Sequence, residues 1–346
     1  MKIVFTFYFL FQLVYLMYKI LITRKLPFEN LEKFGTNFKF NINTGGKLSK
    51  KELLKLVPGI DGIICTLRNK IDAEIMDSAG PNLKVISNFA VGYDNIDIDA
   101  ATDRNIIVTN TPEVLTETTA DLAWALLMAI SRRIIEAHNF ILDNKWKDWH
   151  PLFFAGRDVH SKTLGIIGMG RIGSAIARRS VGFNMKIIYY SRTRKFELEK
   201  LYSMEFKELS ELLKLSDFII LAVPLNPQTK NMIGENELKL MKKTAFIINI
   251  SRGKVIDEKF LIWALENKII AGAGLDVYTI EPISNDNPLL KLDNVVLTPH
   301  IGSSTIETRT KMAKLAFENI INVLEKKFDH AFIVNKNIIS KTFKKH

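Results

Sequence analysis

A glycine-rich turn constrains the fold of this chain more than any other feature of its sequence. The apolar residues 164–167 lead into Gly168, Gly170 and Gly173, which have the spacing G-x-G-x-x-G and precede a helical pattern at 174–180. In this spacing the first glycine permits a tight turn, the second lets a pyrophosphate approach the backbone, and the third lets helix and strand pack closely. The motif alone also fits an ordinary glycine turn. Its position between a strand and a helix favours a dinucleotide, whose phosphates the helix N-terminus would hold.

Strand and helix patterns alternate along the whole chain, which indicates parallel βα units rather than hairpins. A chain of 346 residues is long enough for two domains. An apolar pattern over 118–142 predicts one buried helix between the domains, and a second long helix is expected over 307–327. From Leu164 onward six strands are expected, the number of a doubly wound dinucleotide domain: 164–168, 186–190, 218–222, 245–249, 273–276 and 295–297. Four strands are expected before it: 19–23, 62–65, 84–87 and 106–109.

The first residues form an apolar run, 3–18, that has three interpretations. A spanning helix usually needs about 20 apolar residues, so a membrane anchor would be short. A secretion signal is the second interpretation, although no small-residue cleavage site follows the run. The third, which we favour, is that the chain begins at Met17 and that residues 1–16 come from a mis-assigned start. Sequencing the N-terminus of the protein from its host would decide between them.

Charge and cysteine content narrow the class of protein. The net charge of +11 comes from 48 Lys and Arg against 37 Asp and Glu, but the basic residues are dispersed and form no arginine-rich block. Such a distribution is typical of solubility and of attraction for small anions, so we expect no nucleic-acid partner. The single cysteine, Cys65, lies in a predicted buried strand and is expected to be a core thiol in a reducing, cytoplasmic protein. No metal site is expected.

The residues after the second strand of the dinucleotide domain bear on the choice of cofactor. NAD-binding domains normally place an acidic residue there to hold the ribose 2′-hydroxyl. This chain instead has Ser191, Arg192 and Thr193, followed by two more basic residues. Arginine binds a phosphate through charge-assisted hydrogen bonds, and the hydroxyls can donate to it. The pattern favours NADP(H) over NAD(H), with use of NADH still possible; a solvated basic turn is the alternative.

Three polar residues follow predicted strands, where ligands of open α/β sheets bind: Arg252, Glu281 and His300. Each alone could be an ordinary surface residue. Reduction of a 2-keto acid requires a cation to hold the carboxylate and polarise the carbonyl, and an acid to protonate the new alkoxide. Arg252 can supply the cation and His300 the proton, while Glu281 would favour the imidazolium and orient the ring. The other histidines, His138, His150, His160, His330 and His346, lack such a setting.

Several motifs in this order resemble those of the D-isomer-specific 2-hydroxyacid dehydrogenases, and most closely the glyoxylate/hydroxypyruvate reductases among them. Besides the glycine turn, the motifs are AVGYDNID at 90–97, TNTP at 109–112, NISRG at 249–253, GLDV at 274–277 and TPHIGS at 298–303. The resemblance covers roughly residues 19–338 and leaves the apolar prefix without a counterpart. It implies two doubly wound α/β domains, with a Rossmann cofactor domain at 112–300 inserted in a flavodoxin-like substrate domain at 17–111 and 301–339.

The resemblance also implies roles for individual residues. Arg252, Glu281 and His300 would form the catalytic set. Leu67, Val91, Gly92 and Trp149, with Arg252 and His300, would meet the substrate, and Trp149 would come from the other subunit of a homodimer. The cofactor would be bound by these residues: Gly168, Met169, Gly170, Arg171, Ile172, Gly173, Ser191, Arg192, Thr193, Thr119, Val223, Pro224, Ile250, Ser251, Arg252, Asp276, His300 and Gly302.

The expected activity is reduction of glyoxylate to glycolate, with hydroxypyruvate as a second substrate. Another D-2-hydroxyacid dehydrogenase, of the phosphoglycerate or D-lactate type, is the nearest alternative. A phosphoglycerate dehydrogenase would normally carry an acid after the second strand and often an added regulatory domain. A non-catalytic, cofactor-sensing protein resembling some transcriptional corepressors is a third possibility; the intact Arg252, Glu281 and His300 set argues against it.

Overall fold

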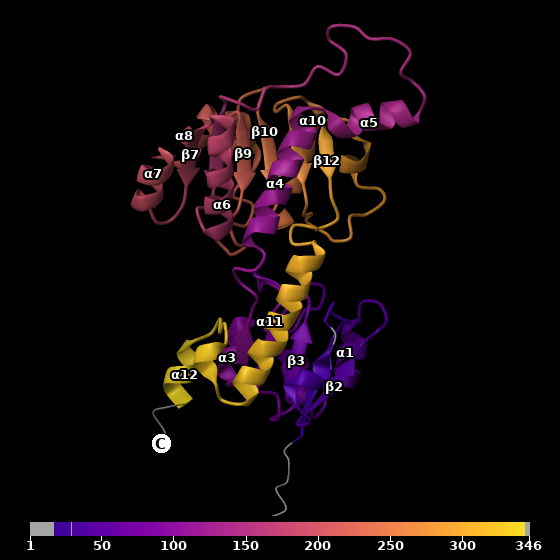
Figure 1. The fold of residues 1–346 in the computed structure, drawn as a ribbon, viewed down its shortest axis with the longest axis vertical. Coiled ribbons are helices and arrows are strands. Elements are labelled where there is room, and N and C mark those ends of the chain that lie inside the picture. The colour runs from indigo at the N-terminus through magenta and orange to yellow at the C-terminus, as the bar shows by residue number, and fades with distance from the viewer. Residues whose placement is uncertain (1–16, 29, 343–346) are drawn as a thin grey trace, which may run out of the picture. The chain divides into compact units, whose positions relative to one another are not determined.

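The computed structural model describes residues 17–28 and 30–342, which form two units (Figure 1). Unit 1 comprises the chain up to Thr111 and from Met312 onward, and unit 2 comprises Pro112–Lys311. The three interpretations of residues 1–16, and His346, lie outside the described residues. The second boundary falls within helix α11 (Ile306–Leu324), whereas it was predicted directly after His300.

Unit 1 is built on a five-stranded parallel sheet with the order β2-β1-β3-β4-β5. This is the strand order of flavodoxin-like domains. The strands are β1 (Tyr18–Ile22), β2 (Phe38–Ile42), β3 (Gly62–Cys65), β4 (Val85–Asn88) and β5 (Ile107–Thr109). Four of them were predicted to within one residue at each end. The edge strand β2 was missed, although Phe38, Phe40 and Ile42 alternate with polar residues as in a half-buried strand; one of its five residues is buried.

Three helices pack on one face of the sheet in unit 1: α1 (Lys50–Leu56), α2 (Ala73–Ala79) and α3 (Ile98–Asp103). The unit also contains α12 (Asn337–Thr342) and the 3-10 turns η1 (Leu31–Phe34) and η5 (Phe328–His330). The capping box of Ser49 and Glu52 begins α1. The residues of α11 from Met312 onward also belong to this unit, where Phe317 contacts the rings of Phe28 and Phe40. Cys65 is buried as predicted, and burial raises the pKa of its thiol to about 12.

Unit 2 contains a seven-stranded parallel sheet with the order β12-β11-β10-β9-β6-β7-β8. The strands are β6 (Thr163–Ile167), β7 (Lys186–Tyr190), β8 (Glu205–Phe206), β9 (Phe218–Leu221), β10 (Phe246–Asn249), β11 (Gly272–Leu275) and β12 (Val295–Leu297). Counted from β6, the order is the 3-2-1-4-5-6 of doubly wound dinucleotide domains with one further strand at the β12 edge. The two doubly wound α/β sheets that the sequence predicted are therefore confirmed. Only the two-residue β8 was missed in this unit.

Alternating side chains bury both faces of the unit 2 sheet. Ile166, Ile220 and Ile248 pack against α4 (Thr116–Ser131) and α6 (Arg171–Ser180). Ile167 and Ile219 point to the opposite face, which is covered by α8 (Leu209–Leu215), α9 (Glu235–Leu240) and α10 (Glu258–Glu266). The remaining elements are α7 (Phe196–Tyr202), η2 (Val181–Phe183), η3 (Gly253–Val255) and η4 (Pro288–Lys291). Buried strands of this kind place their functional groups at the strand ends.

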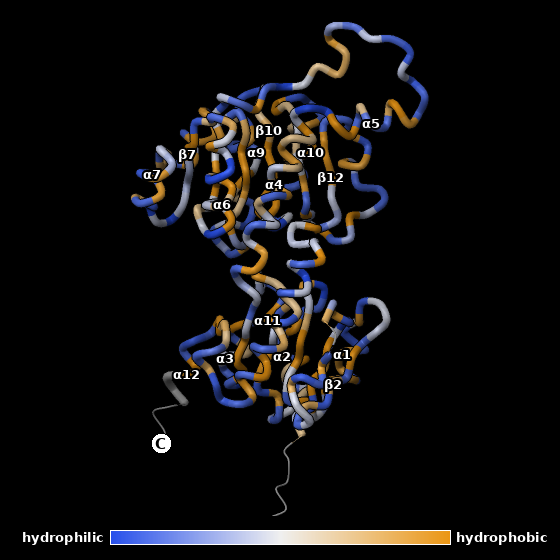
Figure 2. Tube along the Cα trace, in the orientation of Figure 1, coloured by the Kyte–Doolittle hydropathy of each residue, from blue (hydrophilic) through white to orange (hydrophobic). Residues whose placement is uncertain are grey.

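The long helix predicted over 118–142 is two helices. The helix α4 ends at Ser131, and Arg133 adopts a left-handed backbone conformation (φ 54°) before α5 (Ile134–Leu142) begins. The residues of α4 are largely buried, whereas α5 has no buried residue. Figure 2 shows apolar residues along α5, and the exposed segment 143–152 follows it. None of the helices in the described part of the chain combines the length and apolar character of a membrane span.

Candidate active site

The glycine turn lies between β6 and α6, next to β9, where the strand order of unit 2 reverses. Gly168 has a φ of 102°, and a side chain there would press against the carbonyl of Ala222. A side chain on Gly173 would collide with the carbonyl of Gly168. Gly170 instead faces open space, and no side chain of a described residue caps the N-terminus of α6. The turn therefore has room and free N–H groups for a pyrophosphate.

The remaining residues of the turn have different surroundings. Met169 is buried, Ile172 is half-buried, and the exposed Arg171 forms an ion pair with Glu113 (2.8 Å). Val223 lies close to Gly168, since an added Cβ on that glycine would lie 2.8 Å from Val223 Cγ1. The loop after β9 is thus adjacent to the glycine turn. Its exposed Pro224 accepts a hydrogen bond from the Thr229 hydroxyl (2.6 Å).

The basic segment after β7 contains one arginine held by protein groups and one exposed to solvent. Arg194 pairs with Glu199 (2.7 Å) and its guanidinium lies over the ring of Phe196. Arg192 is exposed, and no contact of its side chain to another described residue is found. Ser191 Oγ donates to the carbonyl of Thr193 (2.6 Å). Of the two arginines in this segment, Arg192 is therefore the one available to a ligand.

Arg252 follows β10 and is presented by a backbone turn that Asn249 organises. The Asn249 side chain is buried; its Nδ2 donates to the carbonyl of Arg252 (3.0 Å), and its Oδ1 accepts from the N–H of Ser251 (3.0 Å). A side chain on Gly253 would collide with the backbone of Tyr278 and Thr279. The close approach at Gly253 therefore ties the Arg252 turn to the loop that carries Glu281.

Glu281 and His300 form the central pair of the site. His300 Nδ1 lies 2.8 Å from Glu281 Oε2, and both side chains are partly buried. Glu281 Oε1 also accepts the N–H of Tyr278 (3.1 Å). Burial acts to raise the pKa of Glu281, but the hydrogen bond and charge of His300 outweigh it, so the pKa lies below its ordinary value. Glu281 is thus an ionised carboxylate that occupies Nδ1, which leaves Nε2 of His300 for proton transfer.

The buried carboxylate of Asp276 fixes the loop around His300. It accepts hydrogen bonds from the Thr298 hydroxyl (2.7 Å), the N–H of Ile301 (2.7 Å) and the N–H of Gly302 (2.8 Å). These donors lie on both sides of His300, whose own φ is 55°. Burial raises the pKa of Asp276 above its ordinary value, although the three hydrogen bonds oppose this. Asp276 therefore acts on the site through the position of His300.

Unit 2 brings most of the predicted site residues to one edge of its sheet. A Cβ on Gly302 would lie 3.3 Å from Asp276 Oδ2 and 3.4 Å from Thr119 Cγ2, which places these three residues together. Ile250 and Ser251 are buried in the turn before Arg252. Leu67, Val91 and Gly92 belong to unit 1 instead. Trp149 lies in the segment after α5, with 67% of its surface exposed.

Comparison with known proteins identifies the family of the chain. Residues 124–302 match the D-isomer specific 2-hydroxyacid dehydrogenase, NAD binding domain. A glyoxylate reductase of Thermococcus gammatolerans is 51% identical over 308 residues, which cover 88% of this chain and 92% of the relative. The chain belongs to the D-isomer-specific 2-hydroxyacid dehydrogenases. The family resemblance stated from the sequence motifs is therefore confirmed.

Solved structures of other proteins have the same fold as this 2-hydroxyacid dehydrogenase. A protein from Thermus thermophilus superposes with a TM-score of 0.84 and 43% identity, over 89% of this chain and 97% of that protein. A second is an NADPH-dependent glyoxylate/hydroxypyruvate reductase from Sinorhizobium meliloti, solved with NADP and malonate. It has a TM-score of 0.76 and 31% identity, over 89% of this chain and 94% of that protein.

The structure of this 2-hydroxyacid dehydrogenase adds residues that sequence reasoning missed. Glu258, at the start of α10, accepts the N–H of Thr279 (2.9 Å) and the Nδ2 of Asn287 (2.9 Å), so it clamps the loop that contains Glu281. The Tyr278 hydroxyl donates to the carbonyl of Thr298 (2.9 Å) and connects the Glu281 and His300 loops. Neither residue has a local sequence signal for this role, because its partners lie 20 to 29 residues away.

Proposed function

We propose that this chain is a glyoxylate reductase that uses NADPH to reduce glyoxylate to glycolate, and hydroxypyruvate to D-glycerate. In this proposal unit 2 is the cofactor domain and unit 1 the substrate domain of a cytoplasmic enzyme. The observation that carries it is the His300–Glu281 pair at 2.8 Å, in which Glu281 lies on a loop packed against the Arg252 turn. A cation and an oriented acid beside a dinucleotide turn are the groups that reduction of a 2-keto acid requires.

The residues present fit a nicotinamide cofactor. The glycine turn, from Gly168 to Gly173, would hold the pyrophosphate, and the exposed Arg192, with Ser191 and Thr193, would hold the 2′-phosphate. Val223 and Pro224 would lie near the adenosine, while Thr119, Ile250, Ser251, Asp276 and Gly302 would surround the nicotinamide. NADPH, when bound, supplies the hydride that adds to the keto carbon.

The protein supplies binding and the proton. Arg252 would hold the substrate carboxylate and polarise the keto oxygen, and the backbone at Leu67, Val91 and Gly92 would bind the carboxylate as well. His300, protonated at Nε2, would give that proton to the alkoxide as it forms. The ring then remains oriented, because its Nδ1–H still donates to the ionised Glu281.

Oxidation of NADPH, followed by its absorbance with glyoxylate present, tests the proposal. A steady fall in absorbance that stops when glyoxylate is omitted is the expected result. A panel of 3-phosphohydroxypyruvate, pyruvate and hydroxypyruvate separates glyoxylate reduction from the phosphoglycerate and D-lactate activities. Binding of NADPH without turnover of any keto acid in the panel would instead favour a cofactor-sensing protein and overturn the proposal.

Arg192→Ala should reduce the preference for NADPH over NADH by about ten-fold or more, because one charge-assisted contact to the 2′-phosphate is lost. The ratio of kcat/KM for the two cofactors measures this. Arg194→Ala is the matched control, since its guanidinium is already paired with Glu199. An unchanged ratio in the Arg192 variant would refute the assignment of this segment to the 2′-phosphate.

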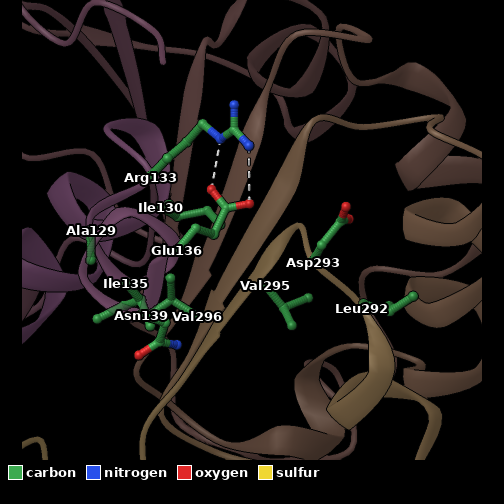
Figure 3. Close-up of a pocket in the computed structure, with 10 residues that line it drawn as sticks. All are labelled: Ala129, Ile130, Arg133, Ile135, Glu136, Asn139, Leu292, Asp293, Val295 and Val296. Carbon is green, nitrogen blue, oxygen red and sulfur yellow. Dashed lines mark hydrogen bonds and ion pairs between the residues drawn. The ribbon is translucent and has the colours of Figure 1, made fainter. Parts of the chain in front are cut away.

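We also propose that the chain forms a homodimer through α5 and the segment after it. Large apolar side chains are exposed there, including Ile141, Leu142, Trp146, Trp149 and Leu152. A pocket of about 220 Å³ lies beside α5, at the start of β12, and the Arg133–Glu136 ion pair lines it (Figure 3). Ligands of parallel sheets bind at the carboxyl ends of strands. This pocket lies at the opposite end of β12. We therefore propose that the second subunit of the dimer covers it.

Trp149→Ala should shift the protein from dimer toward monomer in gel filtration, or increase activity toward keto acids bulkier than glyoxylate. A buried aromatic anchor commonly costs about 2 kcal/mol or more when truncated, which is roughly a 30-fold loss of association. The thermal midpoint of each variant shows whether unit 2 remains folded. If neither the elution volume nor the substrate range changes, Trp149 has no role at the interface.

A further inference from the structure

The loop after β4 holds three consecutive carbonyl groups against donors of the protein. The carbonyl of Ala90 accepts the N–H of Thr111 (2.9 Å), and the carbonyl of Val91 accepts Nδ2 of Asn110 (2.8 Å). The carbonyl of Gly92 accepts Nδ2 of Asn88 (2.8 Å). All three donors belong to the ends of β4 and β5 or to the residues directly after them. Each peptide unit from residue 90 to residue 93 is therefore fixed in orientation.

In a trans peptide the carbonyl and the following N–H point in opposite directions. The N–H groups of Val91, Gly92 and Tyr93 consequently point away from the donors that hold the three carbonyls. None of these three N–H groups donates to another residue in the part of the chain that the structure describes. Val91 and Gly92 are half-buried and Tyr93 is 42% exposed, so a ligand can reach this backbone. Consecutive free N–H groups are a binding site for an anion.

A reciprocal pair of side-chain amides connects this loop to the loop after β3. Asn88 and Asn95 each donate Nδ2 to the Oδ1 of the other, at 3.1 and 3.2 Å. Asn95 Nδ2 also lies 3.3 Å from the carbonyl of Thr66 and 3.2 Å from that of Asn69, on either side of Leu67. Asn88 is fully buried. The amide pair thus fixes the two loops of unit 1 that carry Leu67, Val91 and Gly92 relative to each other.

We propose that Asn110 and the Asn88–Asn95 pair are positioning residues that orient the free N–H groups of residues 91–93 for the carboxylate of the keto acid. This inference rests on the proposed function, and it extends the carboxylate contacts by the N–H of Tyr93. The carboxylate is present in both the substrate and the transition state, so these contacts bind both equally. Their loss raises KM and leaves kcat nearly unchanged.

Asn110→Ala tests the proposal, because it removes the donor that holds the carbonyl of Val91 and frees that peptide to rotate. Asn335→Ala is the matched control. Its buried side chain also holds β5, through the N–H of Val108 (2.9 Å) and the carbonyl of Ile106 (3.0 Å), but contacts neither loop. The probe is oxalate, a dicarboxylate of two carbons that cannot be reduced, titrated calorimetrically into the protein with NADPH bound.

We expect Asn110→Ala to raise the Kd of oxalate and the KM of glyoxylate by about ten-fold, with kcat within about two-fold of the original. Asn335→Ala should lower the thermal midpoint to a similar extent without changing Kd or KM. Asn95→Ala, at a partly exposed position, should raise the same Kd and KM. It replaces Asn110→Ala in the test if the Asn110→Ala protein does not fold.

The proposal is overturned if the folded Asn110→Ala and Asn95→Ala proteins bind oxalate as the original does, or if kcat falls while binding is unchanged. Failure of the proposed function is recognised separately, since oxalate binding then persists and responds to these variants while glyoxylate is not reduced.

Discussion

Replacement of His300 by glutamine should lower kcat for glyoxylate reduction by about 10²–10⁴-fold, the usual contribution of a general acid. Glutamine retains a polar side chain of similar reach but cannot release a proton at neutral pH. Since Arg252 and the unit 1 loops would still bind the carboxylate, KM should change little. Steady-state kinetics with glyoxylate and NADPH measures both constants.

His160→Gln is the control for this result, because His160 is exposed and remote in sequence from the catalytic loops. It should retain the original kcat. A His300→Gln protein that keeps more than about a fifth of the original kcat, with the fold intact, would falsify the assignment of His300 as the acid.

The His300–Glu281 pair makes the stability of the folded protein depend on pH. The lowered pKa of Glu281 means that its carboxylate stays ionised well into the acidic range, and that the pair stabilises the folded protein at pH values above that pKa. This contribution to stability is lost as the pH falls through the pKa of Glu281 in the folded protein. Glu281→Gln keeps the shape of the side chain but removes its ionisable carboxyl group. We therefore expect the thermal midpoint of this variant to fall less steeply than that of the original protein as the pH is lowered through the acidic range; identical profiles would show that ionisation of Glu281 does not stabilise the fold.

Arg252→Ala should lower kcat/KM for glyoxylate by about 10³-fold or more. Loss of one donor to a developing oxyanion commonly costs about 10²–10³-fold, and loss of a charge-assisted bond to the carboxylate adds to it. Arg252→Lys should recover only part of the activity, because an ammonium cannot replace the two parallel hydrogen bonds of a guanidinium. The measurement is kcat/KM with NADPH held at saturation.

Two controls separate the role of the guanidinium from other effects. Arg24→Ala removes an exposed arginine of unit 1 and should leave kcat/KM unchanged. The Kd for NADPH, measured by fluorescence titration, should change little in Arg252→Ala, since the glycine turn and Arg192 are intact. If cofactor binding and kcat/KM fall by the same factor, Arg252 serves the cofactor and not the keto acid.

The glycine turn and the candidate catalytic residues could be located from the sequence because they follow strand ends. Parallel strands bring their carboxyl ends to one edge, so Arg252 and His300 were expected to lie near each other once their strands were recognised. Two of the missed features had weak local signals. Strand β8 has two residues, and the break between α4 and α5 occurs at Ser131–Arg133 without a proline or glycine to mark it.

The supporting hydrogen bonds could not be predicted in this way. Asn110 holds a carbonyl 19 residues earlier, and Glu258 holds an N–H 21 residues later, so both depend on the packed tertiary structure. The same holds for Arg194. The sequence shows only that it is basic, whereas Glu199 and Phe196, on the helix that follows, bind it in the protein.

The proposed catalytic residues and the proposed carboxylate-binding loops belong to different sheets, which has a consequence for how such enzymes diversify. The glycine turn, Arg252, Glu281 and His300 all belong to the Pro112–Lys311 unit, whereas the loops at 66–69 and 88–93 belong to the other. Under the proposed function, changes in these short loops would alter how the keto acid is held and would leave the proposed proton donor and the dinucleotide turn intact. Exchanging these two loops with those of a relative should change the KM for keto acids and preserve the rate of the chemical step.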